Sequence, residues 1–191
     1  MTRYGLGERA LELYTYEGFV LSTVSPGHWR WHHVSGRRNM DIHIVDLPDG
    51  VVLWGDALSC PVALRYKSAG FFFGGPHNLG YFTGKVAGAH SGQKFDEDYL
   101  TDDIEALRDD PDTEPDVVAA LDDMLYMPDP LTYETFILAL ADELPLGYDM
   151  SDVYERRLGW GPTDDVLRAW AAHRVIVAGD HAPIFSGGRF A

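Results

Sequence analysis

The alternation of apolar and polar residues from Met40 to Leu47 constrains the fold of this chain more than any other feature. Pro48-Asp49-Gly50 follows as a turn signal, and residues 51–54 are again apolar. Successive side chains of a strand point to opposite faces, and two such runs joined by a short Pro/Gly turn are typical of a β-hairpin. The pattern therefore predicts an antiparallel hairpin with Ile42 and Ile44 on its buried face.

The run from His28 to His33 alternates in the same way and is predicted to pair with this hairpin. Trp29 and Trp31 would then share the face of the two isoleucines. The opposite face would collect imidazoles, an arginine and a carboxylate: His28, Arg30, His32, Asp41 and His43. This face is where the sequence concentrates its chemically active side chains.

The rest of the chain predicts an α+β fold. Strand patterns at 19–21 and 60–66 extend the sheet to an antiparallel meander of about four strands in the N-terminal half. Apolar residues at helical spacing predict helices over 78–89, after Pro115, over 133–144, near 151–157 and after Thr163. The C-terminal helices are expected to pack on the sheet face that carries Ile42 and Ile44.

The charge is unevenly distributed along what we expect to be a single domain, 1–191, with a β-rich core and first helix in 1–95 and an acidic helical part in 96–191. Residues 1–95 hold nine Lys and Arg against seven Asp and Glu, whereas residues 96–165 hold 22 acids against three Arg. No direct nucleic-acid binding is expected, because neutralising phosphates requires clustered cations. The acidic part is either a solvated helical surface or a surface that meets a basic partner.

Cysteine content and hydropathy predict a cytoplasmic protein. Cys60 is the single cysteine of the sequence, which excludes a disulfide within one chain and fits a reducing compartment. It precedes Pro61, and we expect it to be a small buried side chain. No apolar segment approaches the ~20 residues that cross a bilayer, so no membrane association is expected.

The segment from Phe71 to Lys85 adds a second group of possible ligand contacts. Phe71-Phe72-Phe73 before Gly74-Gly75 either fills the core or forms an aromatic wall around a ligand. The glycines near the helix start at Asn78, together with Lys85, would suit an anion. The predicted ligand-binding residues are therefore Arg30, His32, His43, Phe72 and Lys85.

The polar sheet face also permits metal or acid–base chemistry. A divalent cation there would be held by imidazole nitrogens and carboxylate oxygens: His32, Asp41, His43 and Asp56. General acid–base work by His43 with Asp41 or Asp56 needs no metal. The spacing matches no established metal or nucleophile motif, and the residues indicate no particular cofactor or oligomeric state.

Several short motifs in order resemble an uncharacterised family of small phage and prophage proteins. These motifs are a Trp-bearing strand, Met40-Asp41-Ile42-His43-Ile44-Val45, Pro48-x-Gly50, Val52-Leu53-Trp54-Gly55-Asp56, Tyr81-Phe82-x-x-Lys85 and a final Trp-bearing helix. The resemblance covers roughly residues 29 to 110 and more loosely the last helix. Gly55-Asp56 corresponds to the Gly-Asp pair that ends a strand in the family, whereas His43 and the acidic helical segment are particular to this chain. The resemblance implies a phage setting, with the host cytoplasm as the location, and brings no established activity.

Three functional hypotheses follow from these residues. The first is a phage-encoded, non-enzymatic accessory protein that binds a small anionic or nucleotide-like ligand, or a host protein, and counteracts host defence. The second is a metal-assisted hydrolase that uses the His/Asp face of the hairpin. The third is an acidic decoy whose surface over 96–165 occupies a basic host protein.

Overall fold

The structure is a computed structural model that describes residues 6–36, 40–87, 92–111, 113–125, 132–144, 150 and 157–179. The chain divides into two compact units. The first, which we call the sheet unit, comprises Gly7–Gly92 and Pro162–Ala191, and the second, the helical unit, comprises Met1–Leu6 and Gln93–Gly161. In sequence the helical unit is thus an insertion into the sheet unit. The expectation of one domain over 1–191 stays a prediction, but the last helix belongs with the sheet rather than with the acidic part.

The sheet unit is built on a five-stranded antiparallel meander, with the strands adjacent in chain order. The strands are β1 (Phe19–Ser25), β2 (His28–His33), β3 (Ile42–Leu47), β4 (Gly50–Trp54) and β5 (Val62–Leu64). The α+β prediction is confirmed, and the predicted hairpin is formed by β3 and β4. The strand predicted at 19–21 is longer than expected and continues to Ser25 as β1. The sheet has five strands, where about four were expected.

The predicted division of the sheet into two faces is also confirmed. Trp29 lies opposite Ile44 and Trp31 lies opposite Ile42 across the β2–β3 ladder. All four of these side chains are at most 2% exposed. Burying large apolar side chains on one face is what holds the register, because a slip of one residue would turn them to solvent.

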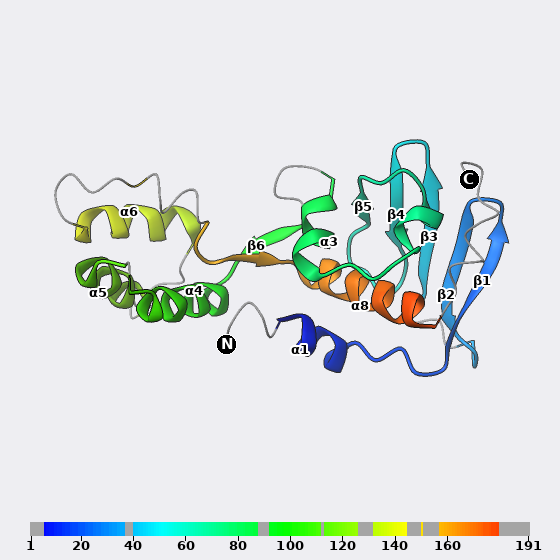
Figure 1. Cartoon of the computed structure of the whole chain (residues 1–191), viewed down its shortest axis with the longest axis horizontal. Coiled ribbons are helices and arrows are strands. Elements are labelled where there is room, and N and C mark those ends of the chain that lie inside the picture. The colour runs from blue at the N-terminus through cyan, green and yellow to red at the C-terminus, as the bar shows by residue number, and fades with distance from the viewer. Residues whose placement is uncertain are drawn as a thin grey trace. The chain divides into compact units, whose positions relative to one another are not determined.

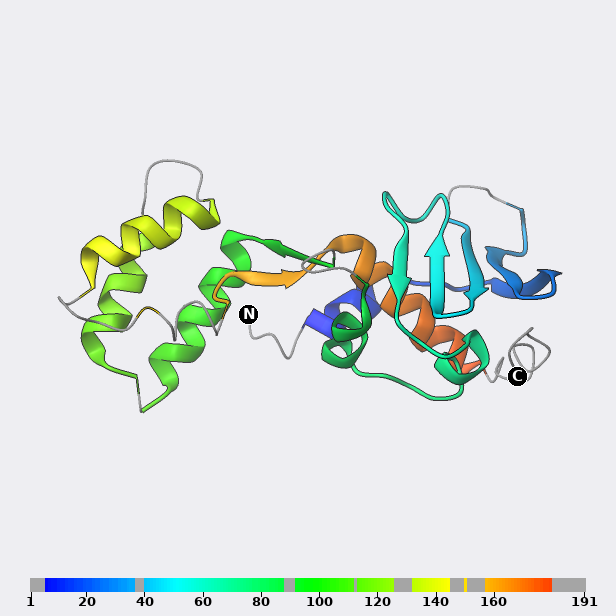
Figure 2. The same cartoon turned by 90° about the horizontal axis from the view of Figure 1, so that it is seen from above.

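Helices cover the apolar face of the sheet, as Figures 1 and 2 show for α8, which runs across it. The helices of this unit are α1 (Leu6–Leu13), α2 (Ala69–Phe72), α3 (Leu79–Lys85) and α8 (Asp164–Ala178). The predicted helix after Thr163 is α8, and the Thr163 hydroxyl caps it by accepting from the Val166 amide. Trp170 and Ile176 of α8 share one core with Ile42 and Ile44.

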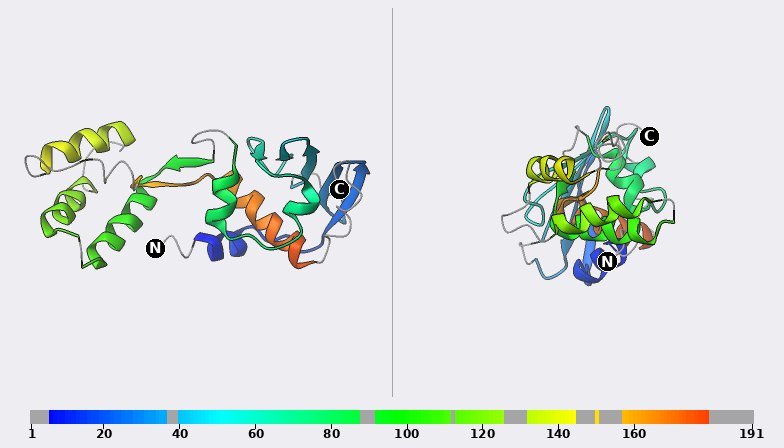
Figure 3. Two further views of the ribbon diagram at one scale, coloured as in Figure 1. Left: turned by 45° about the horizontal axis from the view of Figure 1, so that its top comes forward. Right: turned by 90° about the vertical axis from the view of Figure 1, so that its left-hand side faces the viewer.

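The helical unit, whose described helices are coloured green to yellow in Figure 3, has an apolar core of its own. Its elements are β6 (Gln93–Phe95), α4 (Glu97–Asp109), α5 (Pro115–Met124), α6 (Tyr133–Glu143) and β7 (Trp160–Pro162), with β6 and β7 paired. Leu100, Leu121, Phe136 and Leu140 are fully buried in this core. The helix predicted near 151–157 falls mainly on 151–156, outside the described residues.

The acidic part is more than a solvated surface. Asp102 and Asp103 of α4 are 6% and 8% exposed. A carboxylate oxygen of Asp103 accepts the backbone N–H of Gly159 at 2.8 Å, which anchors the loop before β7. Part of the acidity therefore serves the internal structure of the helical unit.

Two properties predicted from the composition can be compared with the structure: the hydropathy of the helices and the burial of Cys60. None of the described helices has both the length and the apolar character needed to span a membrane. The prediction that Cys60 is buried is wrong, since its side chain is exposed. The reason lies in the backbone, because Asp165 of α8 accepts the N–H groups of Ser59 and Cys60 at 2.8 and 2.9 Å and holds this loop at the surface.

Candidate functional site

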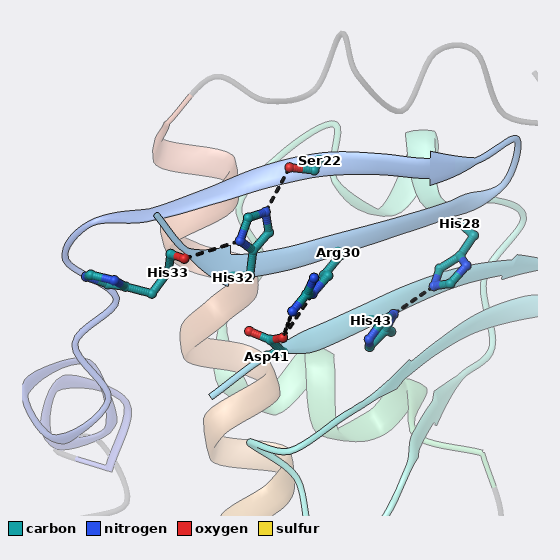
Figure 4. Close-up of polar contacts among 7 residues, drawn as sticks. All are labelled: Ser22, His28, Arg30, His32, His33, Asp41 and His43. Atoms are coloured by element: carbon teal, nitrogen blue, oxygen red, sulfur yellow. Dashed lines mark hydrogen bonds and ion pairs between the residues drawn. The ribbon is translucent and has the colours of Figure 1, made fainter. Parts of the chain in front are cut away.

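The predicted polar face exists, and its residues pair with one another (Figure 4). The Arg30 guanidinium donates through Nε to Oδ2 of Asp41 at 2.9 Å and also through Nη2 to the same oxygen. His32 Nε2 lies 2.9 Å from the Ser22 hydroxyl of β1. These contacts join neighbouring strands, which is the usual role of opposed side chains on one face of a sheet.

His43 lies at the centre of a second pairing on this face. Its Nδ1 is 2.8 Å from Nε2 of His28, and its ring stacks on Trp54 with centroids 4.2 Å apart and planes 12° from parallel. Burial lowers the pKa of His43, and the nearby His28 and Arg30 lower it further. A neutral His43 suits the hydrogen bond to His28, in which one imidazole must accept.

The four residues predicted as metal ligands do not converge. His32 turns to Ser22, Asp41 turns to Arg30, and Asp56 is exposed beyond the end of β4. Within the described part of the chain, no group of three or more His, Cys, Asp and Glu is arranged to hold a metal ion. His32, His43 and Asp41 each use a nitrogen or oxygen atom in a contact with another strand, and these contacts point the three side chains to different partners.

The aromatic cluster divides between the core and the surface. Phe72 is fully buried and packs on Phe82 and His173, so its ring is not accessible to a ligand, contrary to our prediction. Phe71 is 65% exposed. The reason is that Phe71 and Phe72 lie in the short helix α2, in which neighbouring side chains point about 100° apart and so cannot form one continuous wall.

The anion site expected at the start of α3 is not supported. The Asn78 side chain already caps this helix by accepting from the Tyr81 amide at 2.8 Å. Lys85 lies in the last turn of the seven-residue helix, away from its first amides. The predicted cation and the predicted amides are therefore at opposite ends of α3.

Lys85 instead lines a pocket that sequence reasoning missed, of about 420 Å³. We call it the basic pocket, and its lining residues are Pro48, Asp49, Arg65, Tyr66, Lys67, Phe71, Tyr81 and Lys85. The backbone after α3 builds it by pairing with the edge strand β5. The Arg65 amide donates to the Lys85 carbonyl at 2.8 Å, and the Ala87 amide donates to the Ala63 carbonyl at 2.7 Å.

The basic pocket is lined by three cations, Arg65, Lys67 and Lys85, against one acid. Neither Arg65, Lys67 nor Lys85 forms an ion pair with a residue that the structure describes. Lys85 Nζ lies 5.1 Å from the ring centroid of Tyr81 and 5.8 Å from that of Tyr66, within the range of cation–π attraction. Asp49 is the one acid among the lining residues.

Sequence patterns gave only part of this pocket. Lys85 and the phenylalanine run were predicted as possible ligand contacts, whereas Arg65 was only part of the strand predicted at 60–66 and Lys67 was assigned no role. The signal that could have located the pocket is the contiguous Arg65-Tyr66-Lys67, in which one cation precedes and one cation follows an aromatic residue. Their proximity to Lys85 depends on the pairing of β5 with the segment after α3, a contact across about twenty residues.

Comparison with known proteins assigns no family to this chain. No family model matches it, and neither the curated proteins nor the solved structures include a significant match. The resemblance to phage and prophage proteins therefore stays a prediction.

Proposed function

We propose that this chain binds a small anionic, nucleotide-like ligand in the basic pocket. The observation that carries the proposal is the grouping of Arg65, Lys67 and Lys85 around one cavity without ion-pair partners among the described residues. The sheet unit as a whole is formally neutral, with ten Lys and Arg against ten Asp and Glu. Three cations on one small cavity are thus a local concentration of charge, which favours an anion.

The aromatic lining supports a ligand that also carries a planar group. Phe71 is 65% exposed and Tyr81 is 44% exposed, so a face or edge of each ring is open to a ligand. Exposed aromatic rings stack on nucleobases, while guanidinium and ammonium groups bind phosphate oxygens. The volume of about 420 Å³ lies in the ~300–1,000 Å³ range of small-molecule sites.

The proposal is for binding rather than catalysis. The lining residues contain no His, Cys or Ser, and Asp49 is their one carboxylate. A role as a phage-encoded accessory protein that sequesters or senses such a ligand, and so counteracts host defence, follows from the resemblance stated above and is part of the same proposal. The polar face of the sheet takes no part in it.

Isothermal titration of the full chain with AMP and with adenosine tests this function. We expect AMP to bind and adenosine to bind at least about tenfold more weakly, because the phosphate supplies the charge that the three cations meet. The triple variant R65Q/K67Q/K85Q is expected to lose AMP binding. Each of the single variants Arg65→Gln, Lys67→Gln and Lys85→Gln is also compared with Lys94→Gln, a matched control that removes one positive charge in the helical unit, where Lys94 pairs with Asp96.

Two results would contradict the proposal. One is the absence of AMP binding by the unaltered chain. The other is equal binding by the triple variant and by Lys94→Gln, which would show that the lining charges do not hold the phosphate. Binding should also weaken when NaCl is raised from about 0.05 to about 0.5 M, because salt screens exposed charges.

A second candidate rests on the separation of charge between the two units. The helical unit holds 20 Asp and Glu against five Lys and Arg, so it carries the whole net charge of −15. This supports the proposal that the helical unit occupies a basic host protein. Such binding would be captured from host lysate at low salt and lost at high salt, and capture that resists high salt would argue against it.

A further inference from the structure

A partly buried chain of hydrogen bonds ends at the wall of the basic pocket. The Tyr66 hydroxyl donates to the Tyr81 hydroxyl oxygen at 2.9 Å. Tyr66 is only 8% exposed, whereas Tyr81 is 44% exposed and lines the pocket. If Tyr66 donates in this hydrogen bond, the Tyr81 hydroxyl keeps its own hydrogen for a ligand, whereas the opposite direction would use that hydrogen.

His77 determines this direction. Its Nε2 lies 3.1 Å from the Phe72 carbonyl oxygen and 3.1 Å from the Tyr66 hydroxyl oxygen. A carbonyl oxygen only accepts, so Nε2 carries the hydrogen, and Tyr66 cannot donate to it. Stacking on His173, with centroids 5.1 Å apart and planes 12° from parallel, holds the His77 ring in this orientation.

The hydrogen of Tyr66 must therefore go to Tyr81. Burial raises the pKa of the Tyr66 hydroxyl, so it keeps this hydrogen across the physiological range. Tyr81 accepts through its oxygen, and its own hydrogen points away from Tyr66. No other hydrogen-bond partner of the Tyr81 hydroxyl is found among the described residues, which leaves that hydrogen available to a ligand.

We propose that the Tyr81 hydroxyl is a specificity-determining donor of the basic pocket, directed by Tyr66 and His77 onto an oxygen of a phosphate monoester. This rests on the function proposed above and deepens it. Arg65 and Lys67 are exposed and attract any anion, whereas one oriented neutral donor requires an acceptor atom at a defined place. Lys85, above the Tyr81 ring, places a positive charge next to that acceptor.

Titration of AMP into single Tyr→Phe variants tests the inference, because phenylalanine retains the ring and removes only the hydroxyl. We expect Tyr81→Phe to weaken AMP binding by about tenfold or more, as a hydrogen bond to a charged oxygen is lost. Adenosine binding should be unchanged, since stacking is retained. Tyr14→Phe removes a hydroxyl outside the pocket and should change AMP binding by less than about threefold. Tyr66→Phe removes the hydroxyl that directs Tyr81, so it should weaken AMP binding, although by less than Tyr81→Phe, and its melting temperature should fall.

The outcomes separate the inference from the function it rests on. If Tyr81→Phe binds AMP like the unaltered chain while Lys85→Gln binds it more weakly, the role of the hydroxyl is wrong and the pocket function stands. Equal losses for AMP and adenosine in Tyr81→Phe would also overturn the inference, since the effect would then lie in stacking. No AMP binding by the unaltered chain overturns the proposed function itself.

Discussion

The Arg30–Asp41 pair offers the sharpest test of whether the polar sheet face is structural. Asp41 has a side chain only 7% exposed, and among the described residues its carboxylate pairs with Arg30, whose side chain is 36% exposed. The second carboxylate oxygen, Oδ1, is buried with no hydrogen-bond partner among the described residues. Arg30→Met would therefore leave a buried carboxylate without its ion pair while retaining the apolar stem of the side chain.

The expected cost is about 2–3 kcal/mol of unfolding free energy. Breaking a fully buried pair by removing one partner costs about 3–5 kcal/mol, and the partial exposure of Arg30 reduces this through solvent screening. Asp41→Asn should cost about 1 kcal/mol, because the amide keeps an oxygen that accepts from Arg30. The double variant should be no less stable than Arg30→Met alone, which corresponds to a coupling of at least about 1 kcal/mol.

Urea unfolding at pH 7 measures these values in a Trp160→Phe background. The remaining tryptophans, Trp29, Trp31, Trp54 and Trp170, all belong to the sheet unit, so fluorescence then reports that unit. Additive effects within about 0.5 kcal/mol would refute the reasoning. So would a loss of AMP binding in folded Arg30→Met, because the pair would then act in the ligand site rather than in the sheet.

Three further predictions concern stability. His173 is fully buried, and burial lowers its pKa to about 4, so the unfolded state takes up a proton first as the pH falls. The contribution of His173 to the unfolding free energy is therefore fully present above about pH 6.5, and the unfolding free energy should drop by about 3 kcal/mol towards pH 4. Urea titrations of His173→Leu should not show this decrease. Gly55→Ala should lower the unfolding free energy by at least about 2 kcal/mol and the melting temperature by several degrees. Gly55 has φ +144°, and a Cβ there would collide with the Asp41 carbonyl. An unchanged melting temperature would contradict this. Thr132→Ala removes the capping box of α6 and should destabilise the helical unit by about 1 kcal/mol, with faster amide exchange in the first turn of α6. The control Leu138→Ala, at a position of α6 that is 69% exposed, should show neither effect.

The sheet could be predicted because its pattern is local. Period-two alternation around Trp29, Trp31, Ile42 and Ile44 determines which side chains must be buried, and burial then determines the register. Helix starts such as Thr163 were predictable for the same reason, since a cap depends on residues within one turn. Local alternation also gave the correct members of the polar face: Arg30, His32, Asp41 and His43.

What those polar residues do was decided only by the tertiary structure. Asp41 pairs with Arg30, and His32 pairs with Ser22 of the neighbouring strand. The reactive side chains on this face therefore do not converge on one site. The basic pocket exists because the segment after α3 returns to the edge of β5 and sets Lys85 beside Arg65. The sequence alone determined the periodicity and therefore the buried face; the position of charges relative to one another depends on long-range backbone pairing, which leaves no periodic trace in the residues themselves.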